Sequence, residues 1–307
     1  MSKPLVSLCI PTNGVIEWVF PVLDSIFEQN CDDSLFEVVV TDNGKNEEFK
    51  KNIKTYSLKH SNIVYAETSA LPFLNEIESY KRASGELIKF VNHRTLLVEG
   101  TLQKIINFTK NNKEEKPIIY FSNGVIETLK NNVTEYDNFN DFVKNLSYWS
   151  SWSTGMTIWK TDFEKLPKDV ESFNELFPHT TVLFNQRNRK KYVIDNTVIF
   201  DEMPQGKKAK GNYDLFGAFG IEYPGIICDL LRDGSISNNT YRFVTQNNLE
   251  FIVQLYIAYC IRKEYCSYDL TGLQRMYDVF YSKKDFKLKI IKYSIKQFWR
   301  KIKKILN

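Results

Sequence analysis

The feature that most constrains the fold is a regular alternation of short apolar runs and helix-sized segments over the first 125 residues. Segments of helical length, near 15–29, 46–56, 72–83 and 100–110, separate apolar runs at 5–10, 37–41, 62–65, 87–91 and 117–121. Runs such as VVV and LVSLCI are typical of strands buried on both faces, and their alternation with helices predicts right-handed β-α-β units. We therefore expect an α/β fold with a mainly parallel sheet flanked by helices.

The rest of the chain predicts a more mixed organisation. Residues 126–150 are polar and rich in asparagine, which predicts a surface loop and a short helix. A helical segment at 171–184 and a strand-like one at 190–200 would complete the α/β part, and helical segments follow near 212–232, 240–263, 268–281 and 286–306. We predict three parts: an α/β domain over 1–205, a helical extension over 206–285 and a basic amphipathic helix over 286–307.

Composition excludes several classes of protein. With 307 residues, 43% of them hydrophobic, the chain can bury a full core. Its five cysteines are odd in number and form no Cys-x-x-Cys pair, so neither a disulfide framework nor a zinc site is predicted. Residues 1–11 show no secretory leader, and the longest apolar stretch, 251–261, has roughly half the ~20 residues of a membrane-spanning helix. We expect a cytoplasmic protein.

Polar clusters follow the first, second and fourth predicted strands. They are Pro11–Asn13, Asp42–Gly44 and Asn92–Thr95. Turn chemistry explains any one such cluster, because Asn, Asp, Gly and Pro are common in loops. Three clusters at the carboxyl ends of parallel strands indicate a ligand site, since ligands of open α/β sheets bind at that edge. No Gly-x-Gly-x-x-Gly follows the first strand, which argues against a dinucleotide-binding oxidoreductase.

The segments PLVSLCIPTNG, FEVVVTDNG and ASGELIKFVNHR, at their spacing in this chain, resemble the family 2 glycosyltransferases of the GT-A fold over roughly residues 4–200. A later segment, AKGNYDLFGAFGIEYPGII, resembles the part after the catalytic domain in bacterial transferases of the abequosyltransferase type. Those enzymes build surface polysaccharides such as O-antigen or capsule. The resemblance implies inverting transfer of a sugar from a nucleotide-sugar donor to a lipid-linked oligosaccharide.

The resemblance also implies roles for residues on the donor side. Pro11, Thr12 and Asn13 would line the nucleoside pocket, and Asp42 would bind the base or the ribose. A carboxylate suits that role because it accepts hydrogen bonds from ribose hydroxyls or a uracil imide. Asn75 stands where the family often has an asparagine before a helix, and it is either a donor-binding residue or an ordinary surface residue.

The expected metal-binding acids are replaced. In the family the fourth strand ends in Phe-Leu-Asp-x-Asp, whose acids contact the ribose and hold a divalent ion on the diphosphate. Here Asn92 and Arg94 take the acidic positions, with His93 between them, and an arginine cannot bind Mg²⁺ or Mn²⁺. Three alternatives stay open: a metal-independent transferase in which Arg94 pairs with the diphosphate, an ion held by His93 and other residues, or a catalytically silent binding or scaffolding module.

An inverting transferase needs a base near the acceptor hydroxyl. The resemblance places it near His179, with Glu175 one helical turn earlier, and an imidazole pKa of about 6.5 suits the task. The alternative is that His179 caps the helix that begins after Pro178.

Trp152 and Gly155 lie where the family places the acceptor sugar. A tryptophan face suits the apolar side of a pyranose, and a glycine permits close backbone approach. The alternative is that 149–159 is ordinary core.

The basic charge is concentrated at the carboxyl terminus. Residues 286–307 hold eight Lys or Arg and no acid, whereas the whole chain has a net charge of +4. This distribution argues against a nucleic-acid partner. Helical spacing puts the lysines opposite an apolar stripe of Leu288, Ile291, Ile295, Phe298, Trp299, Ile302, Ile305 and Leu306. The pattern predicts a helix on an anionic membrane surface, at the inner face of the plasma membrane, although docking on its own domain or on a partner is the alternative.

Overall fold

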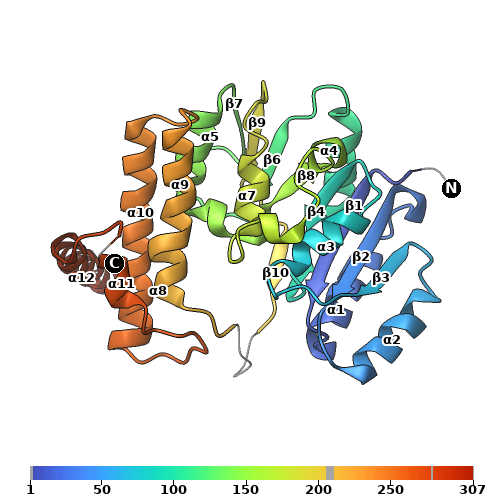
Figure 1. The fold of residues 1–307 in the computed structure, drawn as a ribbon, viewed down its shortest axis with the longest axis horizontal. Coiled ribbons are helices and arrows are strands. Elements are labelled where there is room, and N and C mark those ends of the chain that lie inside the picture. Colours follow the sequence, from blue (N-terminus) through green and yellow to red (C-terminus); the bar gives the residue numbers. More distant parts are fainter. Residues whose placement is uncertain (1–2, 205–210, 278, 307) are drawn as a thin grey trace. The chain divides into compact units, whose positions relative to one another are not determined.

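The computed structural model describes residues 3–204, 211–277 and 279–306, with side chains described up to residue 299. The chain forms two compact units (Figure 1). The first unit contains the residues up to Phe142 together with Trp149–Pro204, and the second contains Val143–Tyr148 together with the described residues from 211 onward. The predicted three-part division at 205 and 285 stays a prediction.

The main sheet of the first unit has the strand order β3-β2-β1-β4-β8. Its strands are β1 (Val6–Thr12), β2 (Phe36–Asp42), β3 (Ile63–Glu67), β4 (Leu87–Phe90) and β8 (Thr157–Trp159). All neighbours are parallel except β8, which runs antiparallel to β4. Thr12 pairs with Asp42 and Asp42 with Glu67, so three strands end level. The predicted mainly parallel α/β fold is confirmed.

Four helices occupy the predicted intervals between these strands: α1 (Ile16–Phe27), α2 (Glu47–Ser57), α3 (Asn75–Arg82) and α4 (Thr101–Asn111). Side-chain caps and the spacing of apolar residues determine where these helices start and which face is buried. Asn46 caps α2, because its side chain accepts a hydrogen bond from the Phe49 amide at 3.2 Å. In α1 the buried residues Trp18, Val19, Val22, Leu23 and Ile26 recur at helical spacing.

The part from 95 to 204 adds two smaller sheets. One has the order β6-β9-β7, from β6 (Ile118–Phe121), β9 (Tyr192–Asp195) and β7 (Val133–Tyr136), and the other pairs β5 (Thr95–Leu97) with β10 (Phe200–Glu202). The helices are α5 (Phe139–Leu146), α6 (Lys160–Phe163) and α7 (Pro178–Phe184), with 3-10 turns η1 (Asp33–Leu35), η2 (Ser147–Ser151), η3 (Ser153–Gly155) and η4 (Val170–Ser172).

Two sequence predictions need correction here. The predicted loop at 126–150 contains strand β7 besides the predicted short helix, and its Val-Thr-Glu-Tyr pattern alternates exposed and half-buried residues. The predicted helix at 171–184 exists only as α7. The Asn174 side chain accepts hydrogen bonds from the amides of Leu176 and Phe177, which favours a turn, and Pro178 then starts a new helix.

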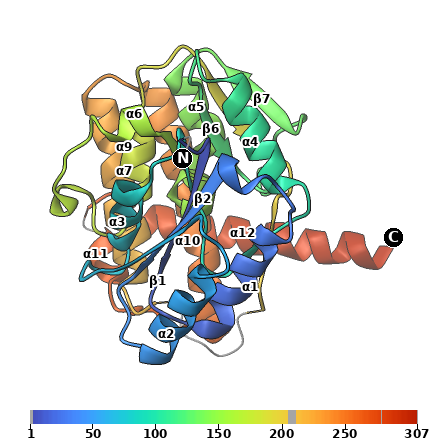
Figure 2. The same cartoon turned by 90° about the vertical axis from the view of Figure 1, so that its right-hand side faces the viewer.

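The second unit is helical. Its elements are α8 (Leu215–Gly217), the π-turn η5 (Ala218–Glu222), α9 (Tyr223–Arg232), α10 (Asn238–Tyr256), the π-turn η6 (Ile257–Ile261), α11 (Leu273–Tyr277) and α12 (Lys283–Leu306). The core includes Phe216, Ile252, Met276 and Phe286. α12 crosses α10 and extends beyond it (Figure 2). Within the described residues, no helix combines the length and hydropathy needed to cross a membrane.

The hexapeptide Val143–Tyr148 belongs to this helical unit. The Tyr223 hydroxyl donates to the Ser147 carbonyl at 2.9 Å, and the Asn247 side-chain amide donates to the Ser147 hydroxyl at 3.1 Å. The ring of Tyr148 stacks on that of Phe251, with centroids 4.9 Å apart. These contacts fix the hexapeptide to helices that follow it by 75 residues or more in the chain.

Candidate functional site

Thr12, at the carboxyl end of β1, joins the polar clusters predicted from the sequence. Its hydroxyl accepts a hydrogen bond from the Gly14 amide at 3.1 Å and lies 2.8 Å from Nδ1 of His93. Its carbonyl accepts from the Asn43 amide at 3.1 Å and from Nδ2 of Asn75 at 3.2 Å. The predicted clusters therefore meet at one edge of the main sheet.

Asp42, the last residue of β2, is buried with 1% of its surface exposed. Its Oδ1 accepts from the Gly44 amide at 2.7 Å, and its Oδ2 accepts from the Tyr65 hydroxyl at 3.3 Å. Burial raises the pKa of Asp42, although the Gly44 and Tyr65 hydrogen bonds oppose that shift. Each carboxylate oxygen keeps a lone pair for a hydroxyl or imide donor. The side chain of Asn13 in the neighbouring loop is exposed, and Pro11 is half-buried.

Asn75 is 1% exposed, so the alternative that it is an ordinary surface residue is wrong. Its Nδ2 donates to the carbonyls of Thr12 (3.2 Å) and Thr41 (2.9 Å), and its Oδ1 accepts from the Thr68 hydroxyl at 2.8 Å. Hydrogen bonds within the protein engage both ends of this amide. Asn75 therefore ties β1 to β2 beneath the candidate site.

The Asn92–Arg94 loop follows β4 and faces Trp18 of α1. Oδ1 of Asn92 accepts from the Arg94 amide at 3.1 Å, and Nε of Arg94 lies 3.5 Å from the same oxygen. The guanidinium carbon of Arg94 lies 5.2 Å from the centre of the Trp18 ring. The centre of the His93 ring lies 5.2 Å from the centre of the same Trp18 ring. Burial, and secondly the charge of Arg94, lowers the pKa of His93 to about 3, so this imidazole is neutral near pH 7.

The side chains of the Asn92–Arg94 loop do not fit a divalent cation. Asn92 offers an amide oxygen already shared with Arg94, and Nδ1 of His93 faces Thr12. Hard cations prefer several oxygen ligands, with carboxylates among them. Over the described ranges, no group of three or more His, Cys, Asp or Glu residues is placed to hold a metal ion. The alternative of an ion held by His93 therefore lacks partner ligands in the part of the chain described.

The predicted acceptor segment lies beside β4. The Phe90 amide donates to the Met156 carbonyl at 3.3 Å, and the Lys89 ammonium donates to the Thr154 carbonyl and, at 2.8 Å, to that of Phe90. Lys89 is fully buried, its ammonium 5.0 Å from the Phe200 ring centre, and burial holds its pKa well below the usual value. The sequence signal for this residue is a lysine inside the apolar run ELIKF.

The two predicted acceptor residues differ in their surroundings. Gly155 is buried, and a Cβ there would overlap the Tyr120 ring, so the close approach at this glycine is made by Tyr120. Trp152 is half-buried, and its carbonyl accepts from the Tyr120 hydroxyl at 2.7 Å. Trp159 is core, with 1% exposed. Trp152 is therefore the better placed of the two for a ligand.

The two base candidates are also in different environments. His179 is 4% exposed, with Nε2 at 2.9 Å from the Ser151 carbonyl and Nδ1 at 3.4 Å from Oε1 of Glu76. Its side chain thus reaches Ser151 and Glu76, and no side-chain cap is present at the start of α7. Glu175 is exposed. Sequence reasoning missed Glu76, which lies more than 100 residues before His179 in the chain.

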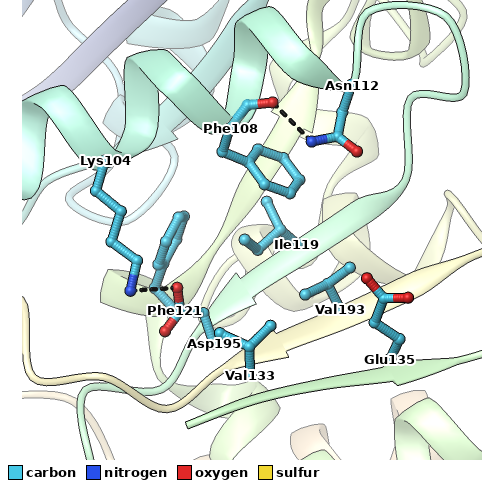
Figure 3. A pocket seen from close by; sticks show the side chains of 9 residues that line it. All are labelled: Lys104, Phe108, Asn112, Ile119, Phe121, Val133, Glu135, Val193 and Asp195. Carbon is cyan, nitrogen blue, oxygen red and sulfur yellow. Dashed lines mark hydrogen bonds and ion pairs between the residues drawn. The ribbon is translucent and has the colours of Figure 1, made fainter.

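A cavity of about 230 Å³ lies elsewhere in the first unit, between α4 and one face of the β6-β9-β7 sheet (Figure 3). At one end the Lys104 ammonium pairs with the buried Asp195 carboxylate at 2.6 Å. The lining is Lys104, Phe108, Asn112, Ile119, Phe121, Val133, Glu135, Val193 and Asp195. None of the residues predicted from the sequence to bind donor or acceptor lines this cavity.

Solved structures resemble this arrangement of strands and helices. The structure of S. aureus TarS 1–349 has a TM-score of 0.60 at 14% identity, covering 93% of this chain and 81% of TarS 1–349. The mannosyltransferase PcManGT from Pyrobaculum calidifontis, solved with GDP-Man and Mn²⁺, has a TM-score of 0.51 at 15% identity, covering 98% of this chain and 88% of its own. The chain has the GT-A fold.

Two further TarS structures also match this chain. TarS 1–349 was also solved with UDP-GlcNAc, and that structure has a TM-score of 0.55 at 16% identity, covering 82% of this chain and 72% of its own. The longer TarS structure has a TM-score of 0.57, and its match covers 43% of that chain. No family model matches the sequence, and no curated protein matches it.

Proposed function

We propose that this chain is an inverting glycosyltransferase of the family 2, abequosyltransferase type, which moves a sugar from a nucleotide donor to a lipid-linked oligosaccharide in surface-polysaccharide synthesis. The observation that carries the proposal is the convergence of Thr12, Asp42 and the Asn92–Arg94 loop at the carboxyl edge of a GT-A sheet. The complexes of TarS 1–349 with UDP-GlcNAc and of PcManGT with GDP-Man support a nucleotide-sugar donor.

Within this proposal, different residues of the edge bind the different parts of the donor. Pro11–Asn13 and Asp42 hold the nucleoside, Asn92 binds the ribose, and neutral His93 supports the loop through Thr12. Arg94 pairs with the diphosphate, because a guanidinium binds phosphate oxygens with two parallel hydrogen bonds. The cation–π contact with the Trp18 ring supports that side chain.

In the proposed reaction the acceptor hydroxyl oxygen attacks the anomeric carbon from the face opposite the diphosphate. The bond from that carbon to the diphosphate oxygen breaks, and the nucleoside diphosphate leaves with the electron pair and an added negative charge that Arg94 stabilises. The hydroxyl proton passes to a base. Of the two candidates, Glu175 is exposed, whereas His179 would first have to release Ser151 or Glu76.

Arg94 provides the test of this mechanism. Arg94→Ala should lower kcat by about 10²–10³-fold, the usual loss when one transition-state donor is removed, while EDTA leaves the wild type active. Arg94→Lys is the matched control: it keeps the charge without the planar fork and should retain intermediate activity. A thermal-shift screen against UDP, GDP, CMP and dTDP sugars, with and without Mn²⁺, identifies the donor. Loss of wild-type turnover on chelation would exclude the proposed role of Arg94.

One observation favours a second candidate, a catalytically silent GT-A module that binds or scaffolds within polysaccharide assembly. Asn92 and Arg94 occupy the positions where the family carries metal-binding acids, and the loop shows no replacement ligand set among the described residues. Nucleotide-sugar binding without turnover for any donor would support this candidate. Turnover of one donor with a purified lipid-linked acceptor would exclude it.

We also propose that α12 attaches the protein to the anionic inner face of the plasma membrane. One face of the helix packs on its own unit through Phe286, Ile290 and Tyr293. Helical geometry puts five apolar side chains on the opposite face, each 45–61% exposed: Leu288, Ile291, Ile295, Phe298 and Trp299. Apolar side chains flanked by lysines are typical of helices that lie in a membrane interface.

Helix α12 differs from the sequence prediction in two respects. The side opposite the apolar stripe is the docked one, so the lysines flank the stripe, and Lys289 and Lys296 each lie 3.4 Å from a carboxylate oxygen of Glu250. Helix α12 therefore packs on its own unit and still exposes its apolar stripe. Residues Ile302, Ile305 and Leu306 of the predicted stripe lie outside the described side chains.

Vesicle co-sedimentation tests the membrane proposal. Replacing Ile295, Phe298 and Trp299 together by Ser should weaken binding to phosphatidylserine vesicles at least 10-fold, because burial of each such side chain is worth about 1.5–3 kcal/mol. Leu58→Ser, at an 88% exposed leucine of the first unit, is the control and should bind like the wild type. Undiminished binding of the triple variant would exclude this role.

A further inference from the structure

The segment Trp149–Met156 is held in place by its backbone carbonyls. Side chains and one amide from β4, β6 and α7 donate to them: the Tyr120 hydroxyl to Trp149 and Trp152, the Thr180 hydroxyl to Ser150, His179 to Ser151, Lys89 to Thr154 and the Phe90 amide to Met156. These donors lie at least 25 residues away in the chain. The path of the segment beside β4 is therefore imposed by its surroundings.

His179 also contacts the carboxyl group of Glu76, which makes it unlike the other donors. Nε2 faces a carbonyl and must therefore carry a hydrogen, whereas Nδ1 faces a carboxyl oxygen at 3.4 Å. Both side chains are buried, with 4% and 3% exposed, and within the described residues neither Nδ1 nor Oε1 has a hydrogen-bond partner, so their 3.4 Å approach to each other is the polar contact left to both atoms. A hydrogen on either atom would allow a hydrogen bond between the carboxyl group and the imidazole. Burial, and secondly the charge of Glu76, raises the pKa of Tyr80, one turn along α3.

The start of α3 connects the two sides of the candidate site. Asn75 fixes the carboxyl ends of β1 and β2, where the donor nucleoside is proposed to bind. The next residue, Glu76, faces the imidazole that holds Ser151. Consecutive residues thus reach the donor edge and the segment that carries Trp152.

We propose that Glu76 is a positioning residue for the acceptor: acting through His179, it fixes the Ser151 carbonyl and thereby the placement of Trp152 beside the carboxyl end of β4. This inference rests on the proposed function, because it takes Trp152 to contact the acceptor sugar. Glu76 itself touches neither substrate. Its loss should therefore weaken acceptor use and leave donor binding intact.

Kinetics with both substrates test the assignment. Glu76→Leu removes the carboxyl group and should raise the acceptor KM at least 10-fold, with the donor KM and the Kd of the product nucleotide within 2-fold of the wild type. Glu76→Gln keeps a side-chain amide that can donate to Nδ1, so it should restore the acceptor KM to within 3-fold. Glu78→Leu is the matched control on the same helix, because Glu78 pairs with Lys81 and Arg82 and should leave both KM values unchanged.

Hydrogen–deuterium exchange gives a readout without any substrate. Peptides covering 149–156 should exchange faster in Glu76→Leu and in His179→Leu, and the double variant should exchange no faster than either single one, since both act through one contact. His179→Gln, which can still donate to Ser151, replaces His179→Leu if the latter does not fold. Unchanged exchange of 149–156, or an equal rise of the donor and acceptor KM values, would overturn the inference.

A failure of the proposed function is distinguishable from a failure of the positioning role of Glu76. A wild type that binds no nucleotide sugar and transfers no sugar refutes the glycosyltransferase assignment, whatever the exchange data show. A wild type that transfers sugar while Glu76→Leu keeps its acceptor KM refutes the positioning role alone.

Discussion

Asn75 offers the sharpest test of how the donor edge is built. Asn75→Ala removes the hydrogen bonds to the carbonyls of Thr12 and Thr41 and the bond from Thr68. An unsatisfied buried polar group costs about 1–3 kcal/mol. The Thr12 carbonyl keeps the hydrogen bond from the Asn43 amide, so the cost of leaving this carbonyl without Asn75 lies at the low end of that range. We expect a total loss of about 3 kcal/mol in the free energy of unfolding.

Thermal and urea unfolding measure this loss. For a unit of about 200 residues, 1 kcal/mol shifts the melting temperature by about 2–4 °C, so Asn75→Ala should lower it by about 6–12 °C. Asn13→Ala is the matched control, because Asn13 is an exposed residue of the same edge, and it should change the melting temperature by less than 2 °C. A drop of less than 2 °C in Asn75→Ala would show that the amide does not tie β1 to β2.

Two further predictions concern His93 and Gly155. The pKa of His93 is about 3 in the folded chain and near 6.5 when unfolded, so the unfolded state binds more protons between these values and stability is lost as pH falls below 6.5. His93→Gln should remove up to about 1.4 kcal/mol of that loss per pH unit. Urea unfolding from pH 7 to 4 measures this effect, and parallel curves of unfolding free energy against pH for the wild type and the variant would contradict it. Gly155→Ala should cost about 1–3 kcal/mol because the new Cβ overlaps Tyr120. Its control, Gly225→Ala in α9, meets no atom within 4 Å and should be neutral or stabilising, and equal unfolding midpoints for the two variants would refute the packing argument.

The sequence predicted β1, β2 and β4 of the main sheet because these strands are buried on both faces and helices fill the gaps between them, whereas β8 was not predicted. VSLCIPT and FEVVVTD form β1 and β2, and the three polar clusters after the strands do meet at one edge. Periodicity detects such elements because burial on both faces leaves a run without polar residues. The edge strand β7, with its alternating Val-Thr-Glu-Tyr pattern in a polar stretch, gave no comparable signal.

The site was predicted only as far as local patterns extend. Thr12 and Asp42 were found because each ends a strand, but the partners Tyr65 and Trp18 come from other elements. The pairing of Glu76 with His179 joins residues far apart in the chain, and neither residue belongs to a motif that would connect them. Contacts of this kind depend on the packing of α3 against α7, which a single sequence does not encode locally.

The hexapeptide Val143–Tyr148 has a consequence for any attempt to divide this protein. Because it packs with the helices of the second unit while its flanks belong to the first, the polypeptide passes between the units more than once. Truncation after Pro204 would leave Ser147 without the Tyr223 hydroxyl and Tyr148 without the Phe251 ring. A chimaera that exchanges the helical unit must therefore carry its own version of these six residues.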